Sequence, residues 1–197
     1  MHLGPVVVEV VISTSYDGKN DVFFLLTAGG TALDGVYILY KQREIGMNYS
    51  YLQTPWGILQ VSASEVGVTG VRPVISRKTE IGNRVTIKAV QELSEYFAGI
   101  RKSFSVTLDL QGTAFQQQVW TELMDIPWGE TRSYSEIAQA IGRPRAVRAV
   151  AQAIGKNPCL IMVPCHRVLG KNGSLTGFSA GLDLKEALLL REHPESD

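Results

Sequence analysis

Cysteine is scarce in this chain of 197 residues, which contains only Cys159 and Cys165. Two cysteines are too few for a disulfide framework, and they are typical of a reducing compartment in which a free thiol persists. We therefore expect a cytoplasmic protein, or a nuclear one if its source is eukaryotic. No apolar run approaches the length of a membrane span, and the apolar first residues lack the basic start of a signal peptide. These absences argue against a disulfide-rich secreted protein and against membrane contact.

Signatures of metals and cofactors are missing as well. No group of cysteines and histidines has metal-ligand spacing, and there is neither a phosphate-binding glycine loop nor a dinucleotide fingerprint. Two of the three histidines lie near the ends of the chain, which leaves His166 as the only internal one. We therefore expect no metal and no cofactor, so that any chemistry must come from side chains.

Net charge is also absent, because 19 basic residues balance 19 acidic ones. The balance is uneven along the chain, since seven basic residues between Glu130 and Asn172 face only two acidic ones, a net charge of +5. A local basic stripe is expected where a neutral protein contacts phosphates. A solvated surface is the alternative that charge alone leaves open.

Three segments follow one another along the chain. Residues 47–110 combine short strands (58–63, 67–71 and 104–110) with a helix at 88–97, and Pro73 is expected to end the second strand. Residues 111–193 are mostly helical, beginning with a helix at 113–124. Residues 1–46 contain strand-like runs but remain an extension of uncertain structure. The fold class expected is α+β, with a small α/β domain before a helical one.

Two short helices joined by a glycine turn are expected within the basic stripe. Ser133-Tyr-Ser-Glu136 matches a capping box, and Gly142 ends the first helix. Pro144 fits the first turn of the second helix, which Asn157 ends. This pattern predicts a helix-turn-helix that grips DNA. An αα-hairpin with solvated arginines is the alternative.

The second helix has two distinct faces. Its apolar stripe comprises Val147, Val150, Ala151 and Ile154, whereas Arg145, Arg148 and Gln152 point away from that stripe. Three alanines (Ala146, Ala149 and Ala153) make the helix slim enough to lie deep in a groove.

A nucleophile follows directly, because Cys165 stands between Pro164 and His166. A cysteine attacks as the thiolate, and a free thiol with a pKa of about 8.5 is mostly protonated at neutral pH. His166 can act as the base, directly or through one water, and a carboxylate holding its other ring nitrogen would complete the relay. We expect that carboxylate to be Glu186, although Asp183-Leu-Lys-Glu186 also fits a helix N-cap.

Other candidates have plainer interpretations. Cys159 precedes an apolar run and is expected to be a buried strand residue. Tyr134 can bury its ring and offer a hydroxyl donor, or it can be an ordinary core tyrosine.

Together, Val163-Pro-Cys-His-Arg-Val168, Gly173-Ser-Leu-Thr-Gly-Phe-Ser179 and Gly181-Leu-x-x-Lys-Glu186 resemble the O6-alkylguanine-DNA alkyltransferases, also called methylated-DNA–protein-cysteine methyltransferases. The resemblance covers residues 47–193. It implies a ribonuclease-H-like first domain and a winged-helix-like second domain. It also implies repair of O6-alkylguanine, and of O4-methylthymine, in double-stranded DNA by a monomer.

The resemblance further implies roles for single residues. Cys165 accepts the alkyl group once and irreversibly, with His166 and Glu186 as its relay. Tyr134 hydrogen-bonds the flipped guanine, and Arg148 fills the stack from the minor groove. Other residues implied in binding substrate or DNA are Asn157, which links the helices to the active-site loop, Ser179 in the loop over the base, and Arg145, Gln152 and Val168. Ala180 departs from the family, in which many relatives have glycine there.

Three rival interpretations remain. A non-catalytic relative would bind alkylated DNA and recruit other repair factors, but such proteins lack the cysteine. A plain helix-turn-helix regulator would leave Cys165 and His166 without a role. A thiol hydrolase would leave the basic helix unexplained.

Overall fold

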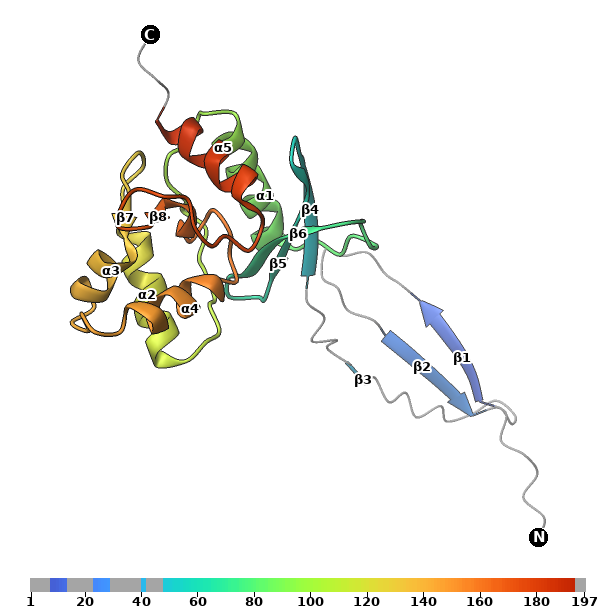
Figure 1. Ribbon diagram of the computed structural model, residues 1–197. Helices are drawn as coiled ribbons and strands as arrows, with labels where there is room; N and C mark the ends of the chain where they lie inside the picture. The colour runs from blue at the N-terminus through green and yellow to red at the C-terminus, as the bar shows by residue number, and fades with distance from the viewer. Residues whose placement is uncertain (1–7, 14–22, 29–39, 42–47, 194–197) are drawn as a thin grey trace. The chain divides into compact units, whose positions relative to one another are not determined.

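The computed structural model describes residues 8–13, 23–28, 40–41 and 48–193 of the chain, which divides into two compact units, Met1–Gly46 and Met47–Asp197. In the first unit, β1 (Val8–Ser13), β2 (Phe23–Ala28) and β3 (Tyr40–Lys41) form an antiparallel sheet in that order (Figure 1). These strands fall within or beside the strand-like runs of the sequence, whose remaining residues lie outside the described part.

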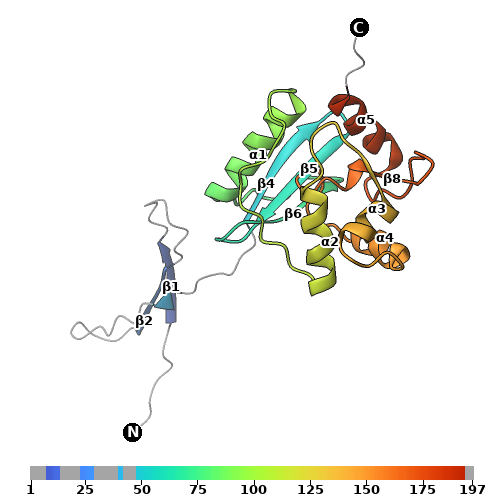
Figure 2. The same cartoon turned by 90° about the vertical axis from the view of Figure 1, so that its left-hand side faces the viewer.

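The second unit opens with an antiparallel sheet of β4 (Asn48–Thr54), β5 (Gly57–Ala63) and β6 (Val68–Val74). Gly57 has a φ of 115° in the turn that joins β4 to β5, a conformation that favours glycine. Helix α1 (Arg84–Phe97) lies along this sheet (Figure 2), and Ser50 of β4 donates a 2.9 Å hydrogen bond to Thr86 of α1. The helix begins four residues earlier than expected because Asn83 and Thr86 form a capping box.

Pro73 was expected to end this strand, but it lies within β6, opposite Leu59. Val71, two residues earlier, directs its N–H and C=O away from β5 toward Pro158 and Leu160. The direction of the backbone groups repeats every two residues along a strand. The nitrogen of Pro73, like that of Val71, therefore points away from β5. The proline therefore removes no ladder hydrogen bond from the sheet.

The prediction of a strand at 104–110 is also wrong. This segment makes only a single bridge, in which Leu108 pairs with Val68 of β6. The buried carboxylate of Glu92 on α1 accepts hydrogen bonds from Ser105 and from the backbone of Val106. The segment is therefore held against α1 at one end and bridged to β6 at the other, and it forms no regular strand.

The remaining elements are mostly helical. They are α2 (Ala114–Met124), β7 (Arg132–Ser133), α3 (Tyr134–Ala140), α4 (Val147–Gly155), the 3-10 turn η1 (Cys165–Arg167), β8 (Val168–Leu169) and α5 (Leu182–Glu192). Strands β7 and β8 pair in parallel. The α+β class is thus confirmed, with a small sheet before a helical part.

A single core joins the sheet to the helices. The indole nitrogen of Trp120 on α2 donates a 2.9 Å hydrogen bond to the backbone oxygen of Ala153 on α4. Strand β6 and helices α1, α2, α3 and α5 each contribute a side chain that is at most 1% exposed, respectively Val71, Leu93, Leu123, Ile137 and Leu188. The sheet and helices therefore depend on each other for burial.

We predict that a protein starting at Met47 folds by itself, because the two units are separately compact. Its midpoint of thermal unfolding should lie within roughly 4 °C of the full-length value, the shift that about 1 kcal/mol causes at this size. Differential scanning calorimetry of both proteins measures it. The apolar strands β1 and β2 argue the other way, so an insoluble shortened protein or a larger drop would show that residues 1–46 belong to the same folding unit.

Candidate active site

The first helix of the expected pair forms as the sequence predicts. The hydroxyl of Ser133 accepts a 3.2 Å hydrogen bond from the backbone of Glu136, whose carboxylate accepts one of 2.6 Å from the backbone of Ser133. Helix α3 is followed by Gly142 with a φ of 71°. Pro144, however, lies in the turn before α4 and not in its first turn, because α4 begins only at Val147.

Helix α4 separates a buried and an exposed face. Val150 and Ile154 are buried, whereas Arg148 and Gln152 are exposed as expected, and so is Arg145 in the turn before the helix. Ala153 is only 3% exposed. It faces the core beside Trp120, so it does not contribute to the exposed face of the helix.

Asn157 joins α4 to the cysteine. Its side-chain nitrogen donates hydrogen bonds of 2.9 Å to Sγ of Cys165 and 2.8 Å to the backbone oxygen of Val163. Its side-chain oxygen accepts one of 2.9 Å from the backbone of Cys159. One amide thus ties the end of the helix pair to the thiol, at the junction that the family resemblance implied.

The turn before Cys165 is strained at Ile161. This residue has a φ of 73° and is 1% exposed, and a β-branched residue in this conformation costs about 1–3 kcal/mol. The turn is held by a hydrogen bond from Val163 to Cys159, and β6 pairs with the same segment through Val71. Packing and hydrogen bonds therefore impose the backbone that presents the cysteine.

Cys165 is 4% exposed, and burial raises the pKa of its thiol to about 11. The hydrogen bond from Asn157 and the charge of Lys185 lower that pKa without offsetting the burial. The resting side chain is therefore a thiol that needs a base. Burial raises the pKa of Cys159 to about 12, and this residue is the buried core cysteine that the sequence predicts.

The histidine that follows Cys165 in the chain is held by a buried carboxylate. Nε2 of His166 lies 2.9 Å from Oε1 of Glu192, and neither side chain is more than 1% exposed. Arg167 donates to both oxygens of Glu192, at 2.7 and 2.9 Å. Burial would raise the pKa of Glu192, but the hydrogen bonds and charges of His166 and Arg167 lower it to about 2. The carboxylate is therefore ionised at neutral pH.

The state of His166 follows from its surroundings. Burial lowers its pKa more than the hydrogen bond and charge of Glu192 raise it, so the imidazole is neutral at pH 7. Because Glu192 is ionised, Nε2 is the nitrogen that carries the proton and donates it. Nδ1 is buried and makes no hydrogen bond within the described residues. It is the ring atom with a free lone pair.

Glu186 was therefore the wrong carboxylate. It is exposed on α5, whereas Glu192, six residues later, faces His166. At about 100° per residue the two side chains project roughly 240° apart around the helix. The stripe Leu184, Leu188 and Glu192, with its spacing of four residues, marks the buried face and could have identified the partner.

Sequence reasoning also missed Lys185. It is fully buried, and its ammonium donates hydrogen bonds of 2.6 Å to the backbone oxygen of Val168 and 2.8 Å to that of Thr176. The hydroxyl of Tyr134 donates to the same Thr176 oxygen at 3.2 Å. Two side chains thus pin the loop between β8 and α5, which contains the exposed Ser179.

Val168 does not belong to the DNA-contacting surface. Its side chain is 0% exposed and its backbone oxygen is occupied by Lys185. It packs inside the helical part, so its inclusion among the binding residues was wrong.

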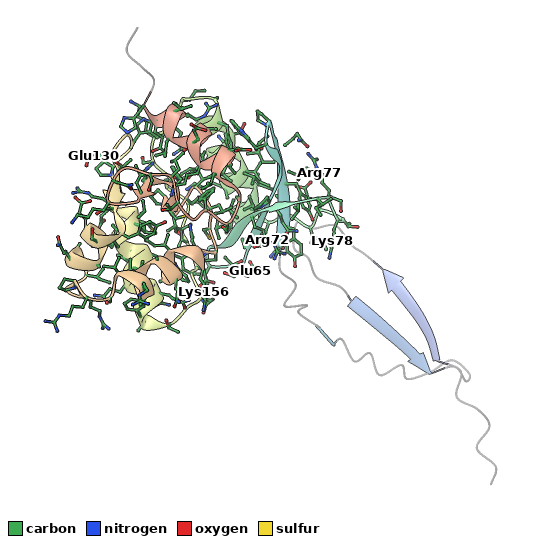
Figure 3. The ribbon with its side chains drawn as sticks, viewed as in Figure 1. Glu65, Arg72, Arg77, Lys78, Glu130 and Lys156 are labelled. Atoms are coloured by element: carbon green, nitrogen blue, oxygen red, sulfur yellow. The ribbon has the colours of Figure 1, made fainter. Side chains whose placement is uncertain are left out.

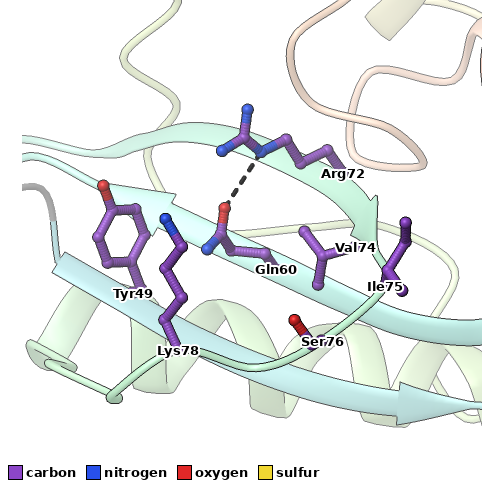
Figure 4. Close-up of a pocket in the computed structure, with 7 residues that line it drawn as sticks. All are labelled: Tyr49, Gln60, Arg72, Val74, Ile75, Ser76 and Lys78. Atoms are coloured by element: carbon purple, nitrogen blue, oxygen red, sulfur yellow. Dashed lines mark hydrogen bonds between the residues drawn. The ribbon is translucent and has the colours of Figure 1, made fainter.

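Two hollows lie elsewhere on the described surface. One of about 380 Å³ lies at the basic turn Arg143–Ala146 before α4. The other, of about 310 Å³, lies on the sheet, where Arg72 donates a 3.1 Å hydrogen bond to Gln60 (Figure 4). Neither is lined by Cys165, whose thiol is covered.

In the described part of the chain, no group of three or more His, Cys, Asp and Glu side chains could hold a metal ion. No helix there is long and apolar enough to cross a membrane.

Comparison with known proteins identifies the family to which this fold belongs. Residues 47–110 match the model of the 6-O-methylguanine DNA methyltransferase ribonuclease-like domain, and residues 114–194 match that of its DNA binding domain. The chain belongs to this family. The methylated-DNA–protein-cysteine methyltransferase of Mycolicibacterium paratuberculosis is 45% identical over 76% of the chain and 94% of that protein.

Two solved structures from Mycobacterium tuberculosis are also similar. An O6-methylguanine methyltransferase is 42% identical with a TM-score of 0.69, over 77% of this chain and 96% of that one. OGT in complex with DNA is 45% identical with a TM-score of 0.68, over 74% and 93%. This chain is thus a member of a family of alkyl-transferring repair proteins, as its motifs indicated.

Glu192→Gln should be far more damaging to this family member than Glu186→Gln. Removing the charge leaves Arg167 buried without a counterion, which costs about 3–5 kcal/mol, whereas the exposed change should stay within about 0.5 kcal/mol. The folded-state pKa of Glu192 is about 2 against an ordinary 4.5. Its stabilisation is therefore present above pH 4.5 and is lost as the pH falls toward 2.

Urea unfolding at a series of pH values tests both statements. The wild type and Glu186→Gln should lose stability across this acid window, and Glu192→Gln should show a smaller loss there. An equal acid dependence in all three proteins would contradict the assignment.

Proposed function

We propose that this protein repairs DNA by direct reversal, transferring the alkyl group of O6-alkylguanine to its own Cys165. The observation that carries this proposal is the thiol bonded to Asn157 at the end of the basic helix pair, next to a histidine held by Glu192. O4-methylthymine, which also has a methyl group on a ring oxygen, is a second substrate. The product is a thioether, which is a very poor leaving group. The protein therefore reacts once.

DNA binding is assigned to the exposed face of α4. Arg148 and Gln152 lie there, and Arg145 lies in the turn just before the helix. None of them has an acidic partner among the described residues, so they are free to contact phosphates and bases. Ala149 keeps this face narrow, which suits the minor groove. We assign one monomer to each lesion, because all these residues come from a single chain.

A base inside duplex DNA cannot reach a covered thiol, so the damaged nucleotide must leave the stack. Arg148 enters the space that it vacates. Tyr134 stands beside the receiving loop, which contains Ser179 and is held at Thr176 by Lys185 and Tyr134. When the base enters, the Tyr134 hydroxyl exchanges its hydrogen bond to Thr176 for one to the guanine ring, and the backbone amide of Ser179 faces O6. Ala180 adds a methyl group to this loop and restricts bulky alkyl groups.

The transfer itself is one displacement at carbon. The Cys165 proton moves to Nδ1 of His166 through a bridging water, and Glu192 stabilises the imidazolium that forms. The thiolate attacks the alkyl carbon, the bond from that carbon to O6 breaks, and its electron pair remains on guanine. A hydrogen bond from the Tyr134 hydroxyl lowers the charge on the departing base. The guanine anion then takes up a proton from solvent, and the imidazolium of His166 releases the proton that it received, so both groups end neutral.

Both cysteines are free thiols. A reducing compartment preserves them, so we assign the protein to the cytoplasm, or to the nucleus in a eukaryotic source.

Incubation with duplex DNA containing O6-methylguanine should add one methyl group per protein molecule, detected by intact mass spectrometry. Cys165→Ala should show no gain, and Cys159→Ala should react like the wild type because its thiol is a core residue. Cys165→Ala should still bind DNA with nearly unchanged affinity, since phosphate contacts come from α4. Methyl transfer by Cys165→Ala would overturn the mechanism.

Arg148→Ala should slow repair of the duplex by about 10-fold or more, because the flipped state loses its filler at a cost of at least about 1.4 kcal/mol. Reaction with the free alkylated base should change little, since a free base has no stack to leave. Arg77→Ala is the matched control. Arg77 lies on the sheet-domain side, away from Lys156 at the end of α4 (Figure 3), and its removal changes the net charge equally.

Single-turnover rates on both substrates separate the possibilities. Equal losses on duplex and free base would indicate a folding defect and would contradict the role given to Arg148. A loss in Arg77→Ala equal to that in Arg148→Ala would reduce the effect to general charge.

A further inference from the structure

A residue of the sheet domain contacts the relay of the helical domain, which consists of His166 and Glu192. Tyr96 lies in the last turn of α1, and its hydroxyl donates a 2.7 Å hydrogen bond to Oε1 of Glu192 on α5. This is the same oxygen that receives the hydrogen bond from His166. The two residues are 96 positions apart in the chain, so the bond is a tertiary contact between two domains.

The hydroxyl is held in a fixed position. Tyr96 is 0% exposed, and its ring centroid lies 5.5 Å from that of Phe97, 5.6 Å from Phe104 and 5.3 Å from Trp128. Burial and the neighbouring carboxylate raise the pKa of Tyr96, so the hydroxyl keeps its proton and remains a donor. A donor on a rigid ring defines where its acceptor must lie.

Arg167 cannot fix the position of Glu192 relative to His166 in the same way. It follows His166 in the chain, within the same 3-10 turn, so its contact with Glu192 moves with the histidine. Tyr96 is anchored on a different element. The end of α1 also accepts a hydrogen bond from Arg191 at the backbone oxygen of Phe97, which fixes the last turn of α5 from the same side.

We propose that Tyr96 is a positioning residue for the reaction of Cys165, which orients Glu192 and through it the base His166. The inference rests on the proposed function for its meaning in repair, but its test also has a readout that needs no alkylated DNA. It makes the ribonuclease-like domain a contributor to reactivity and not only a support.

We infer that Tyr96 controls the orientation of the Glu192 carboxylate and not its ionisation. Arg167 contributes a full charge and two hydrogen bonds to Glu192, so the carboxylate stays ionised at neutral pH without the neutral hydroxyl. Without Tyr96 the carboxylate can tilt away from Nε2, which makes His166 a weaker base. The titratable and charged groups that face this site from every side are Cys165, His166, Arg167, Lys185, Arg191 and Glu192.

Tyr96→Phe removes a single oxygen and keeps the ring. We expect it to slow alkyl transfer by roughly 10-fold at neutral pH, the lower end of the effects seen for residues that orient a histidine ligand. The loss should be recovered at higher pH, where the thiol ionises without help. Affinity for DNA should not change.

Tyr51→Phe is the matched control. Tyr51 is a 7% exposed tyrosine of the same sheet domain, and its hydroxyl is hydrogen-bonded to Gln60 and to the backbone of Lys78. This variant loses a buried hydroxyl of the same kind but touches no part of the relay. It should lower stability by a similar amount and leave the pH dependence of Cys165 unchanged.

The decisive measurement is the rate of Cys165 alkylation by iodoacetamide as a function of pH, without DNA and with the modified cysteine identified by fragmentation mass spectrometry. We expect the midpoint to move to higher pH in Tyr96→Phe and to stay at the wild-type value in Tyr51→Phe. Identical midpoints in all three proteins would overturn the proposal and leave Tyr96 a packing residue. Absence of methyl transfer from DNA in the wild type would instead refute the proposed function.

If Tyr96→Phe fails to fold, Phe104→Leu provides the second variant. It removes the ring stacked on Tyr96 and lets the hydroxyl move while both relay residues remain. A midpoint shifted to higher pH supports the proposal, and an unshifted midpoint in a folded Phe104→Leu contradicts it.

Discussion

The carboxylate of Glu192 is the constraint on which the rest of the second unit depends. A buried ion costs several kcal/mol unless its oxygens are fully hydrogen-bonded, and the side chain of Glu192 is only 1% exposed. Its donors come from α1 through Tyr96 and from the 3-10 turn through His166 and Arg167. Helix α1, the 3-10 turn and α5, which carries Glu192, must therefore keep their relative positions for the charge to remain stable.

This constraint explains how a covered cysteine can be reactive on demand. The thiol is protonated at rest because burial raises its pKa, and a protonated, covered thiol oxidises slowly. In the proposed mechanism, the neutral His166 that follows Cys165 becomes a base because Glu192 stabilises the positive charge that proton transfer creates. The cysteine is thus protected until a flipped base fills the site, which suits a protein that reacts once.

Patterns with local causes could be predicted from the sequence. The capping box at Ser133, the exposed arginines of α4 and the buried Cys159 all follow from spacing and residue type, and the Cys165 motif identified the family. Glu192 was missed because the choice among carboxylates depends on helix phase, which a first-turn pattern at Glu186 does not report. Lys185 was missed because a buried lysine satisfied by backbone oxygens has no signature in one sequence. Pro73 misled because only pairing shows which edge its nitrogen faces.

The sheet domain determines more of the site than its distance along the chain implies. Val71 of β6 pairs with the segment around Cys159, and this pairing helps to hold Ile161 in its strained conformation just before the cysteine. Tyr96 of α1 holds the carboxylate that orients the base. The backbone that presents the thiol and the side chain that directs its base are therefore both fixed from outside the helical domain. A helical domain alone would contain every residue of the family motif, yet it would lack the contacts that fix the cysteine turn and the relay.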